Sequence, residues 1–240
     1  MALHPLLAAA ASDHYVHVKG VGADTLSFAR TLGPVFCARP GDDPVVTMAI
    51  EGDDPEQTPY ASCRTAPLSL HTDYATFAQP PRFTISHCIE PDPAWPEGGQ
   101  SITVMMRPLL ASLRKERPEL YRFLRDMPVP FRRNREHDRY HAGVEQWSIV
   151  DAEERVRFDR TLIEPILAEE GSERAREALE RVREFDEYCE RSPHQVRFAL
   201  ARDEALIIDN HHVLHSRGPC TIRHENGRTL RREVNLVFLD

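Results

Sequence analysis

Two short apolar segments near opposite ends of the chain most constrain how it can fold. The first, residues 68–73, contains His71 and Asp73, and the second, residues 213–215, ends with His215. On extended backbone, side chains two positions apart leave the same face, so His71 and Asp73 can point at one metal ion. Two imidazoles and one carboxylate form the ligand set that holds non-haem Fe(II) with coordination positions left open. The third ligand must come from a distant strand, and His215 is well placed to supply it.

The periodicity of the chain predicts many short strands with helices inserted between them. Strands bounded by proline and glycine turns are expected at residues 15–19, 45–50, 82–89, 101–106 and 230–239, and another after Pro67 around His71. Hairpins are expected within residues 146–158 and 196–208, and helices at residues 25–32, 108–125 and 173–189. This pattern predicts one domain over residues 1–240, mainly β with inserted helices. Its expected architecture is the two-sheet jelly roll, also called a double-stranded β-helix or cupin-like fold.

The composition argues against several classes of partner. The formal net charge of −8 disfavours a surface built for nucleic acids, so none is expected as a partner. No apolar run approaches the roughly 18 residues that a membrane span needs, so no membrane association is expected. Five cysteines without CxxC spacing argue against a disulfide framework or a zinc knuckle and suit a reducing cytoplasm. The sequence leaves open whether the protein is a homo-oligomer.

Five motifs, taken in order, resemble those of one enzyme family. They are Leu-His-Thr-Asp at 70–73, Pro-Pro-Arg-Phe at 80–83, Gly-Gly-Gln-Ser at 98–101, Asp-Asn-His-His-Val-Leu-His-Ser-Arg at 209–217 and Gly-Arg-Thr-Leu-Arg-Arg at 227–232. On these residues the chain resembles the Fe(II)/2-oxoglutarate-dependent dioxygenases, in the branch of taurine dioxygenase (TauD/TfdA) and the clavaminate synthase-like proteins. The resemblance implies a jelly-roll enzyme that uses Fe(II), 2-oxoglutarate and O₂.

The residue types and the resemblance agree on the catalytic metal ligands, which are His71, Asp73 and His215. Fe(II) held on one face by three protein ligands keeps three positions for a chelating 2-oxo acid and O₂. His211 and His212 compete for the third place because they lie close to His215 in the sequence. Neither occupies the ligand position of the motif, and His212 is expected either to orient a ligand or to be structural.

Arg228 and Arg232 are the candidates for binding 2-oxoglutarate. Burying the distal carboxylate of this co-substrate demands a fixed cation, and a guanidinium can bind a carboxylate through two hydrogen bonds. Both arginines alternate with apolar residues onto one face of the last predicted strand, unless they project into solvent at its end. The resemblance implies that Arg228 binds the distal carboxylate and that Arg232 lies nearer the metal or the substrate. Ser101, where the family usually has threonine, would donate a hydrogen bond to a co-substrate carboxylate, or Thr103 would do so instead.

The sequence constrains substrate-binding residues much less. Tyr74 and Thr76 directly follow the metal motif, and Arg232 is a third candidate for contact with the substrate. Two segments, at about residues 74–80 and 127–145, are expected to be lid-like. The second carries cationic groups that suit an acidic substrate, unless it is a solvated loop of mixed charge.

These expectations combine into one functional hypothesis with two alternatives. The chain would oxidise, above all by hydroxylation, a C–H bond of a small polar metabolite such as an amino acid or related carboxylate, releasing succinate and CO₂. The first alternative is a non-catalytic jelly-roll protein that binds a metabolite. The second is a zinc-dependent hydrolase, because two histidines and an aspartate also suit Zn²⁺. Paired inward arginines favour the oxygenase over the hydrolase.

Overall fold

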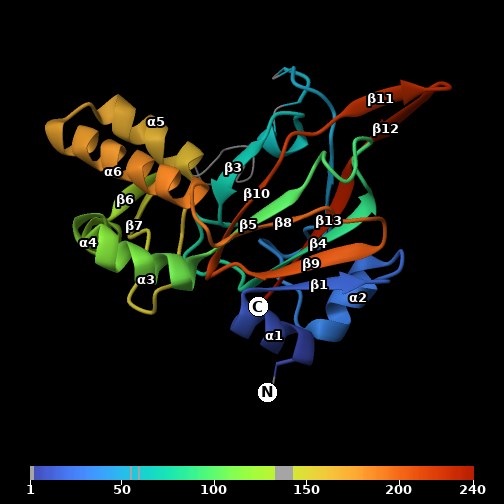
Figure 1. Ribbon diagram of the computed structural model, residues 1–240, viewed down its shortest axis with the longest axis horizontal. Helices are drawn as coiled ribbons and strands as arrows, with labels where there is room; N and C mark the ends of the chain where they lie inside the picture. The colour runs from blue at the N-terminus through green and yellow to red at the C-terminus, as the bar shows by residue number, and fades with distance from the viewer. Residues whose placement is uncertain (1–2, 55, 59, 133–142) are drawn as a thin grey trace.

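Two antiparallel sheets form the centre of the computed structural model, which describes residues 3–54, 56–58, 60–132 and 143–240 (Figure 1). The larger sheet has the order β1-β9-β4-β13-β2, and its strands are Tyr15–Lys19, Glu204–Asp209, Phe83–Glu90, Glu233–Leu239 and Val46–Ala49. The smaller sheet has the order β3-β10-β5-β8, with strands Leu68–His71, Val213–Arg217, Ser101–Met105 and Gln195–Phe198. Two further pairs are β6 (Val129–Arg132) with β7 (Val144–Trp147), and β11 (Ile222–Glu225) with β12 (Arg228–Arg231).

The inner faces of the two sheets share a buried layer. Cys88 and Ile208 of the larger sheet belong to one apolar cluster with Val213 of the smaller sheet. Because side chains alternate along a strand, Thr84 in β4 and His215 in β10 also face this interior. Residues from distant parts of the sequence therefore meet between the sheets.

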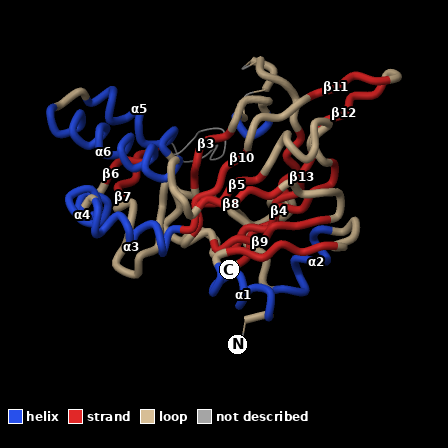
Figure 2. The backbone as a smooth tube through the Cα atoms, in the orientation of Figure 1, coloured by secondary structure: helices blue, strands red, loops and turns tan. Residues whose placement is uncertain are grey.

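Helices pack on the outer sides of the sheets (Figure 2). On the larger sheet, α1 (Pro5–Asp13) and α2 (Thr25–Leu32) bury Leu7 and Ala29 against Ile85 and Val237. Against Leu70, Val104 and Leu214 of the smaller sheet lie α3 (Met106–Glu116), α4 (Pro118–Asp126), α5 (Arg160–Glu170) and α6 (Glu173–Glu190). A single 3₁₀ turn, η1, spans Ala61–Cys63. None of the helices in the described ranges is both long and apolar enough to cross a membrane.

The helical region is more extensive than the sequence predicted. The single helix expected at residues 108–125 is two helices, because α3 ends at Glu116 and α4 begins with Pro118 at its first turn. Helix α5 was not predicted, since Pro165 interrupts its pattern. It begins after Asp159, whose carboxylate accepts a hydrogen bond from the Thr161 amide at 2.9 Å.

The hairpin predicted within residues 146–158 is present but shorter than expected, and the one predicted within residues 196–208 is wrong. Val150 and Val156 form an antiparallel bridge, the Arg157 amide donates to the Ile149 carbonyl at 2.8 Å and the Asp151 amide donates to the Arg155 carbonyl at 3.0 Å, whereas β7 (Val144–Trp147) pairs with β6. Strands β8 and β9 lie in different sheets, where β8 pairs with β5, and β9 pairs with β4 and β1. Closeness in sequence favours a hairpin, but β8, β9 and β10 alternate between the two sheets, as β3, β4 and β5 also do.

The last predicted strand, residues 230–239, is divided at Arg232. Strand β12 ends at Arg231 and pairs with β11, whereas β13 begins at Glu233 with a register shift against β4. The expectation that Arg228 and Arg232 share one strand face is therefore wrong.

Asp186 on α6 leads to a prediction about stability. Its Oδ2 lies 3.3 Å from Arg160 Nη1, and burial raises the pKa of Asp186 from 3.8 to about 6. A raised carboxyl pKa means that folding free energy is lost as the pH rises through the range from about 4 to 6. We expect Asp186→Asn to be more stable than the parent protein at pH 8, by about 1–3 kcal/mol, and to lose this advantage at pH 4. Urea unfolding at both pH values measures the difference, and an equal difference at both contradicts the prediction.

Candidate metal centre

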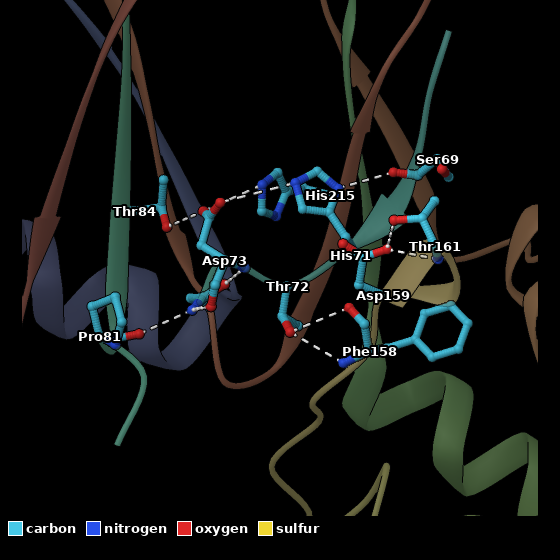
Figure 3. A network of polar contacts seen from close by, with 11 residues as sticks. Ser69, His71, Thr72, Asp73, Pro81, Thr84, Phe158, Asp159, Thr161 and His215 are labelled. Carbon is cyan, nitrogen blue, oxygen red and sulfur yellow. Dashed lines mark hydrogen bonds and ion pairs between the residues drawn. The ribbon is translucent and has the colours of Figure 1, made fainter. Parts of the chain in front are cut away.

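His71, Asp73 and His215 are brought together where the smaller sheet meets the larger one (Figure 3). His71 is the last residue of β3, and its partner in register on β10 is His215. The centroids of the two imidazole rings lie 4.2 Å apart. Asp73 follows two residues after His71, and Thr84 of β4 donates a hydrogen bond to its Oδ2 at 2.7 Å. The three side chains therefore meet as the sequence predicted, although Asp73 lies in the turn after β3 and not on extended strand backbone.

The possible ligand atoms of these three residues face one another. Asp73 Oδ2 lies 3.3 Å from His215 Nε2, and Asp73 Oδ1 lies 3.9 Å from His71 Nε2. One ligand atom from each residue can be chosen so that all lie within 4.8 Å of one another. In the described part of the chain, this is the only group of three or more His, Cys, Asp or Glu residues with such an arrangement. Two imidazole nitrogens and a carboxylate oxygen fit a divalent transition metal.

Hydrogen bonding leaves the Nε2 atoms available to a metal. His71 Nδ1 donates to the Ser69 carbonyl at 2.9 Å, which places the ring's lone pair on Nε2. His215 Nδ1 is buried and has no hydrogen-bond partner among the described residues, while its Nε2 faces Asp73. Both rings thus present the same nitrogen to the carboxylate.

The charge states of the triad also suit a metal ion. Burial opposes ionisation of Asp73, but His215, His71 and the Thr84 hydroxyl outweigh it and hold the pKa of Asp73 well below its usual range. Burial, followed by the neighbouring His215, lowers the pKa of His71. Metal ligands must be deprotonated, so a charged Asp73 and a neutral His71 are already in the binding form at neutral pH.

Asn210, in the turn between β9 and β10, holds the backbone of Asp73. Its Oδ1 accepts a hydrogen bond from the Asp73 amide at 2.8 Å, and its Nδ2 donates to the carbonyls of Asp73 at 3.1 Å and Pro81 at 3.0 Å. The side chain is 1 % exposed. Tyr74, which follows the ligand, has a φ of 55° and turns the chain sharply. Sequence reasoning missed this role of Asn210, for which its place in the 209–217 motif was the only signal.

Asn210→Ala is expected to weaken metal binding by about 10- to 100-fold, as the loss of other groups that orient ligands does. The apoprotein should stay folded, because the contact removed lies at one turn. Anaerobic titration with Fe(II) measures the affinity, and Asn226→Gly at an exposed hairpin tip is the matched control. An unchanged affinity in a folded Asn210→Ala protein contradicts the positioning role.

Residues directly before α5 hold the segment after His71 in place through hydrogen bonds. The Thr72 amide donates to the Phe158 carbonyl at 2.7 Å, and the Phe158 amide donates back to Thr72 Oγ1 at 3.1 Å. The Arg157 guanidinium donates to the carbonyls of Ala75, at 3.0 Å, and Phe77. The lid-like segment predicted at residues 74–80 is therefore attached to the body of the protein in this structure.

The other substrate and lid predictions have different outcomes. In the segment 127–145, strands β6 and β7 form a small sheet, and residues 133–142 lie outside the described residues. Tyr74 packs edge to face on Phe238, with ring centroids 4.9 Å apart. Thr76 is half-buried, and its role in substrate binding stays a prediction.

Arg232 is buried beside Ser101 of β5. It is 8 % exposed, and in the described part of the chain the only hydrogen bond of its guanidinium joins Nη2 to Ser101 Oγ at 3.5 Å. No carboxylate within the described ranges forms an ion pair with it. Gly99 makes room for the side chain, since a Cβ there would lie 2.7 Å from Arg232 Cδ. Burial lowers the pKa of Arg232, which reflects the cost of a guanidinium without an anionic partner.

Arg228 lies far from this interior. It is exposed at the start of β12, opposite Glu225, on a hairpin that projects from the two sheets (Figure 1). Its expected place on an inward strand face is wrong, because the predicted strand bends into this hairpin. Arg217, by contrast, is buried and donates to backbone carbonyls, including that of Ser62 at 3.2 Å.

The two competing histidines have partners of their own. His212 Nδ1 lies 3.0 Å from the buried Asp209 Oδ2, and His211 Nε2 lies 3.2 Å from the Pro80 carbonyl. Neither belongs to the group of ligand atoms around Asp73. Thr103 is fully buried opposite His215, and its hydroxyl donates to the Val196 carbonyl at 3.5 Å.

Several solved structures share this architecture. A taurine dioxygenase from Burkholderia xenovorans aligns with a TM-score of 0.67 at 17 % identity, covering 100 % of this chain and 83 % of its own. An asparagine oxygenase in complex with Fe(II), 2S,3S-3-hydroxyasparagine and succinate aligns with a TM-score of 0.64 at 16 % identity. The alignment covers 98 % of this chain and 77 % of the oxygenase. The non-haem iron oxygenase OrfP in complex with Fe, succinate and (3S)-hydroxy-L-Arg aligns with a TM-score of 0.67 at 12 % identity. The alignment covers 98 % of this chain and 79 % of OrfP. The predicted jelly-roll fold is confirmed.

Sequence comparison agrees with the structural comparison. No curated protein matches the chain significantly. The family model described as taurine catabolism dioxygenase TauD, TfdA family, matches residues 4–233, which is nearly the whole chain. With the two-sheet fold and the assembled His-Asp-His triad, this match shows that the chain belongs to the TauD/TfdA family of Fe(II)- and 2-oxoglutarate-dependent oxygenases.

Proposed function

We propose that His71, Asp73 and His215 hold Fe(II) and that Arg232, together with Ser101, binds the distal carboxylate of 2-oxoglutarate. The reaction proposed is oxidation, above all hydroxylation, of a C–H bond in a small polar metabolite such as an amino acid or related carboxylate. When bound, iron and 2-oxoglutarate would let O₂ act as the oxidant: 2-oxoglutarate is converted to succinate and CO₂, with one oxygen atom of O₂ entering succinate and the other the hydroxylated substrate.

The observation that carries this proposal is the buried guanidinium of Arg232. A buried cation without a carboxylate partner is costly, and an anionic ligand removes that cost. Ser101, its hydrogen-bond partner, lies two residues along β5 from Thr103, which pairs with His215. Two residues of strand span about 7 Å, a separation that a five-carbon keto-diacid can bridge between the triad and Arg232.

The chain's own contribution is positioning, charge and exclusion of water. Thr84 and Asn210 orient Asp73 from opposite sides, through its carboxylate and its backbone. The Ser69 carbonyl fixes the tautomer of His71. Enclosure between two packed sheets strengthens the attraction between the Arg232 guanidinium and an anion.

The expected substrate class and the expected cellular location of the protein also have support. Two similar structures hold hydroxylated asparagine or hydroxylated arginine together with succinate. Tyr74 and Thr76, on the segment that follows the metal ligand, are proposed to contact the substrate. The five cysteines are all free, which supports a reducing location such as the cytoplasm.

Anaerobic addition of Fe(II) and 2-oxoglutarate tests the proposal. We expect a metal-to-ligand charge-transfer band in the visible spectrum, and production of succinate once air is admitted. A zinc hydrolase using the same ligands gives no such band, and a non-catalytic binder gives no succinate with any candidate substrate. Absence of the band in a folded, iron-loaded protein overturns the proposal.

A further inference from the structure

A cavity of about 400 Å³ lies at the edge strand β2, beside the segment that carries the metal ligand Asp73. Its lining includes the aromatic residues Phe36, Tyr74 and Phe238 and the acidic residues Asp42 and Asp43. We call this cavity the Tyr74 pocket. Its volume falls in the range of small-molecule sites in proteins.

Aromatic rings form one wall of the Tyr74 pocket. The ring of Tyr74 packs edge to face on Phe238 at 4.9 Å and on Phe36 at 5.2 Å, measured between centroids. The Phe36 amide donates to the Phe238 carbonyl at 2.8 Å, which fixes this residue against β13. The faces of aromatic rings carry negative charge density, so such a wall attracts cations.

The lining of the pocket carries negative charge. Asp43 accepts a hydrogen bond from the Val45 amide at 2.9 Å, and the exposed Asp42 carboxylate has no hydrogen bond or ion pair within the described ranges. Lysine, arginine and histidine are absent from the lining residues that the structure describes. A pocket lined by both carboxylates and aromatic rings favours an organic cation and disfavours an anion.

The Tyr74 pocket adjoins the metal centre. Tyr74 directly follows Asp73, and Phe238 is the register partner of Thr84, whose hydroxyl donates to the Asp73 carboxylate. The same two segments therefore support a metal ligand and one wall of the pocket. The triad residues are not among the described lining residues; Tyr74 is the lining residue that adjoins one of them in the chain.

We propose that the Tyr74 pocket binds a positively charged group of the substrate, an alkylammonium or a guanidinium. This inference rests on the proposed function and narrows its substrate class to metabolites that carry such a group, basic amino acids among them. A cationic substrate differs from the acidic substrate that the cationic residues of segment 127–145 suggested.

Paired probes that differ in one charge test this inference. L-arginine is compared with neutral L-citrulline, and L-lysine with L-norleucine, by anaerobic calorimetry on protein loaded with Fe(II) and 2-oxoglutarate. We expect each cationic probe to bind at least about tenfold more tightly than its neutral counterpart. The preference should fall below about threefold in Asp42→Asn/Asp43→Asn, whereas Asp126→Asn on the exposed end of α4 should keep it.

The outcomes separate the two proposals. Equal binding of cationic and neutral probes, or no binding of either cation at millimolar concentration, overturns the inference about the pocket. A preference that survives in Asp42→Asn/Asp43→Asn also overturns it. If the charge-transfer band is intact in these experiments, the proposed function stands regardless. If the band is missing from the parent protein while the cation preference is present in the apoprotein, the proposed function fails and the pocket remains a cation site.

Discussion

Asp73→Asn is expected to lower Fe(II) affinity by more than about 100-fold, beyond the usual cost of losing a group that only orients a ligand, and to abolish succinate formation. The substitution keeps the size of the side chain and an oxygen for the Thr84 hydrogen bond, but it removes the negative charge between His71 and His215. That charge is the only anionic donor in the triad. Anaerobic metal titration, with thermal unfolding as a check on folding, measures the effect.

The control for this substitution is Asp126→Asn, which removes the same charge from an exposed helix end. It should leave both metal affinity and succinate formation unchanged. A folded Asp73→Asn protein that binds Fe(II) as tightly as the parent protein rules out Asp73 as a ligand, and with it the proposed metal centre.

The candidate metal triad was predictable because two of its residues lie close together in the sequence. His71 and Asp73 are two residues apart and point at one place, although β3 ends at His71 and Asp73 lies in the following turn, and a distant histidine on a strand had to complete the set. The strand pattern likewise located β1, β4 and β5 within one or two residues. Helix α2 was predicted with its observed bounds from the Gly33-Pro34 pair that follows its end, and the structure adds Asp24 as the cap at its start.

Features that depend on tertiary contacts were not predictable. Asn210 reaches Asp73 only because the β9–β10 turn folds onto the segment after β3. The assignment of Arg228 to the interior failed because alternation says which residues share a face of a straight strand, not where the strand bends. Consecutive β8 and β9 were expected to pair, yet they lie in different sheets. The Tyr74 pocket joins residues from three distant segments, so no sequence window contains it.

Arg232→Met is expected to weaken 2-oxoglutarate binding by about 150- to 5,000-fold, which corresponds to the roughly 3–5 kcal/mol measured when one partner of a buried ion pair is removed. The affinity of Arg232→Lys for 2-oxoglutarate should lie between those of the parent protein and Arg232→Met, because an ammonium keeps the charge but not the two parallel hydrogen bonds of a guanidinium. Titration of the charge-transfer band with 2-oxoglutarate measures the affinity. Fe(II) binding in the absence of co-substrate should be unaffected.

The melting temperature of the apoprotein tests the role of Arg232 independently. Without an anion, Arg232 is a buried cation whose only guanidinium hydrogen bond in the described part of the chain is the long one to Ser101. Replacing it with an apolar side chain should therefore raise the melting temperature of the apoprotein and remove the further rise that 2-oxoglutarate causes with metal present. Arg228→Met, in the exposed hairpin, is the matched control and should change neither property. If Arg228→Met instead loses 2-oxoglutarate binding while Arg232→Met retains it, the exposed hairpin must fold over the centre, and the buried guanidinium is not the co-substrate's partner.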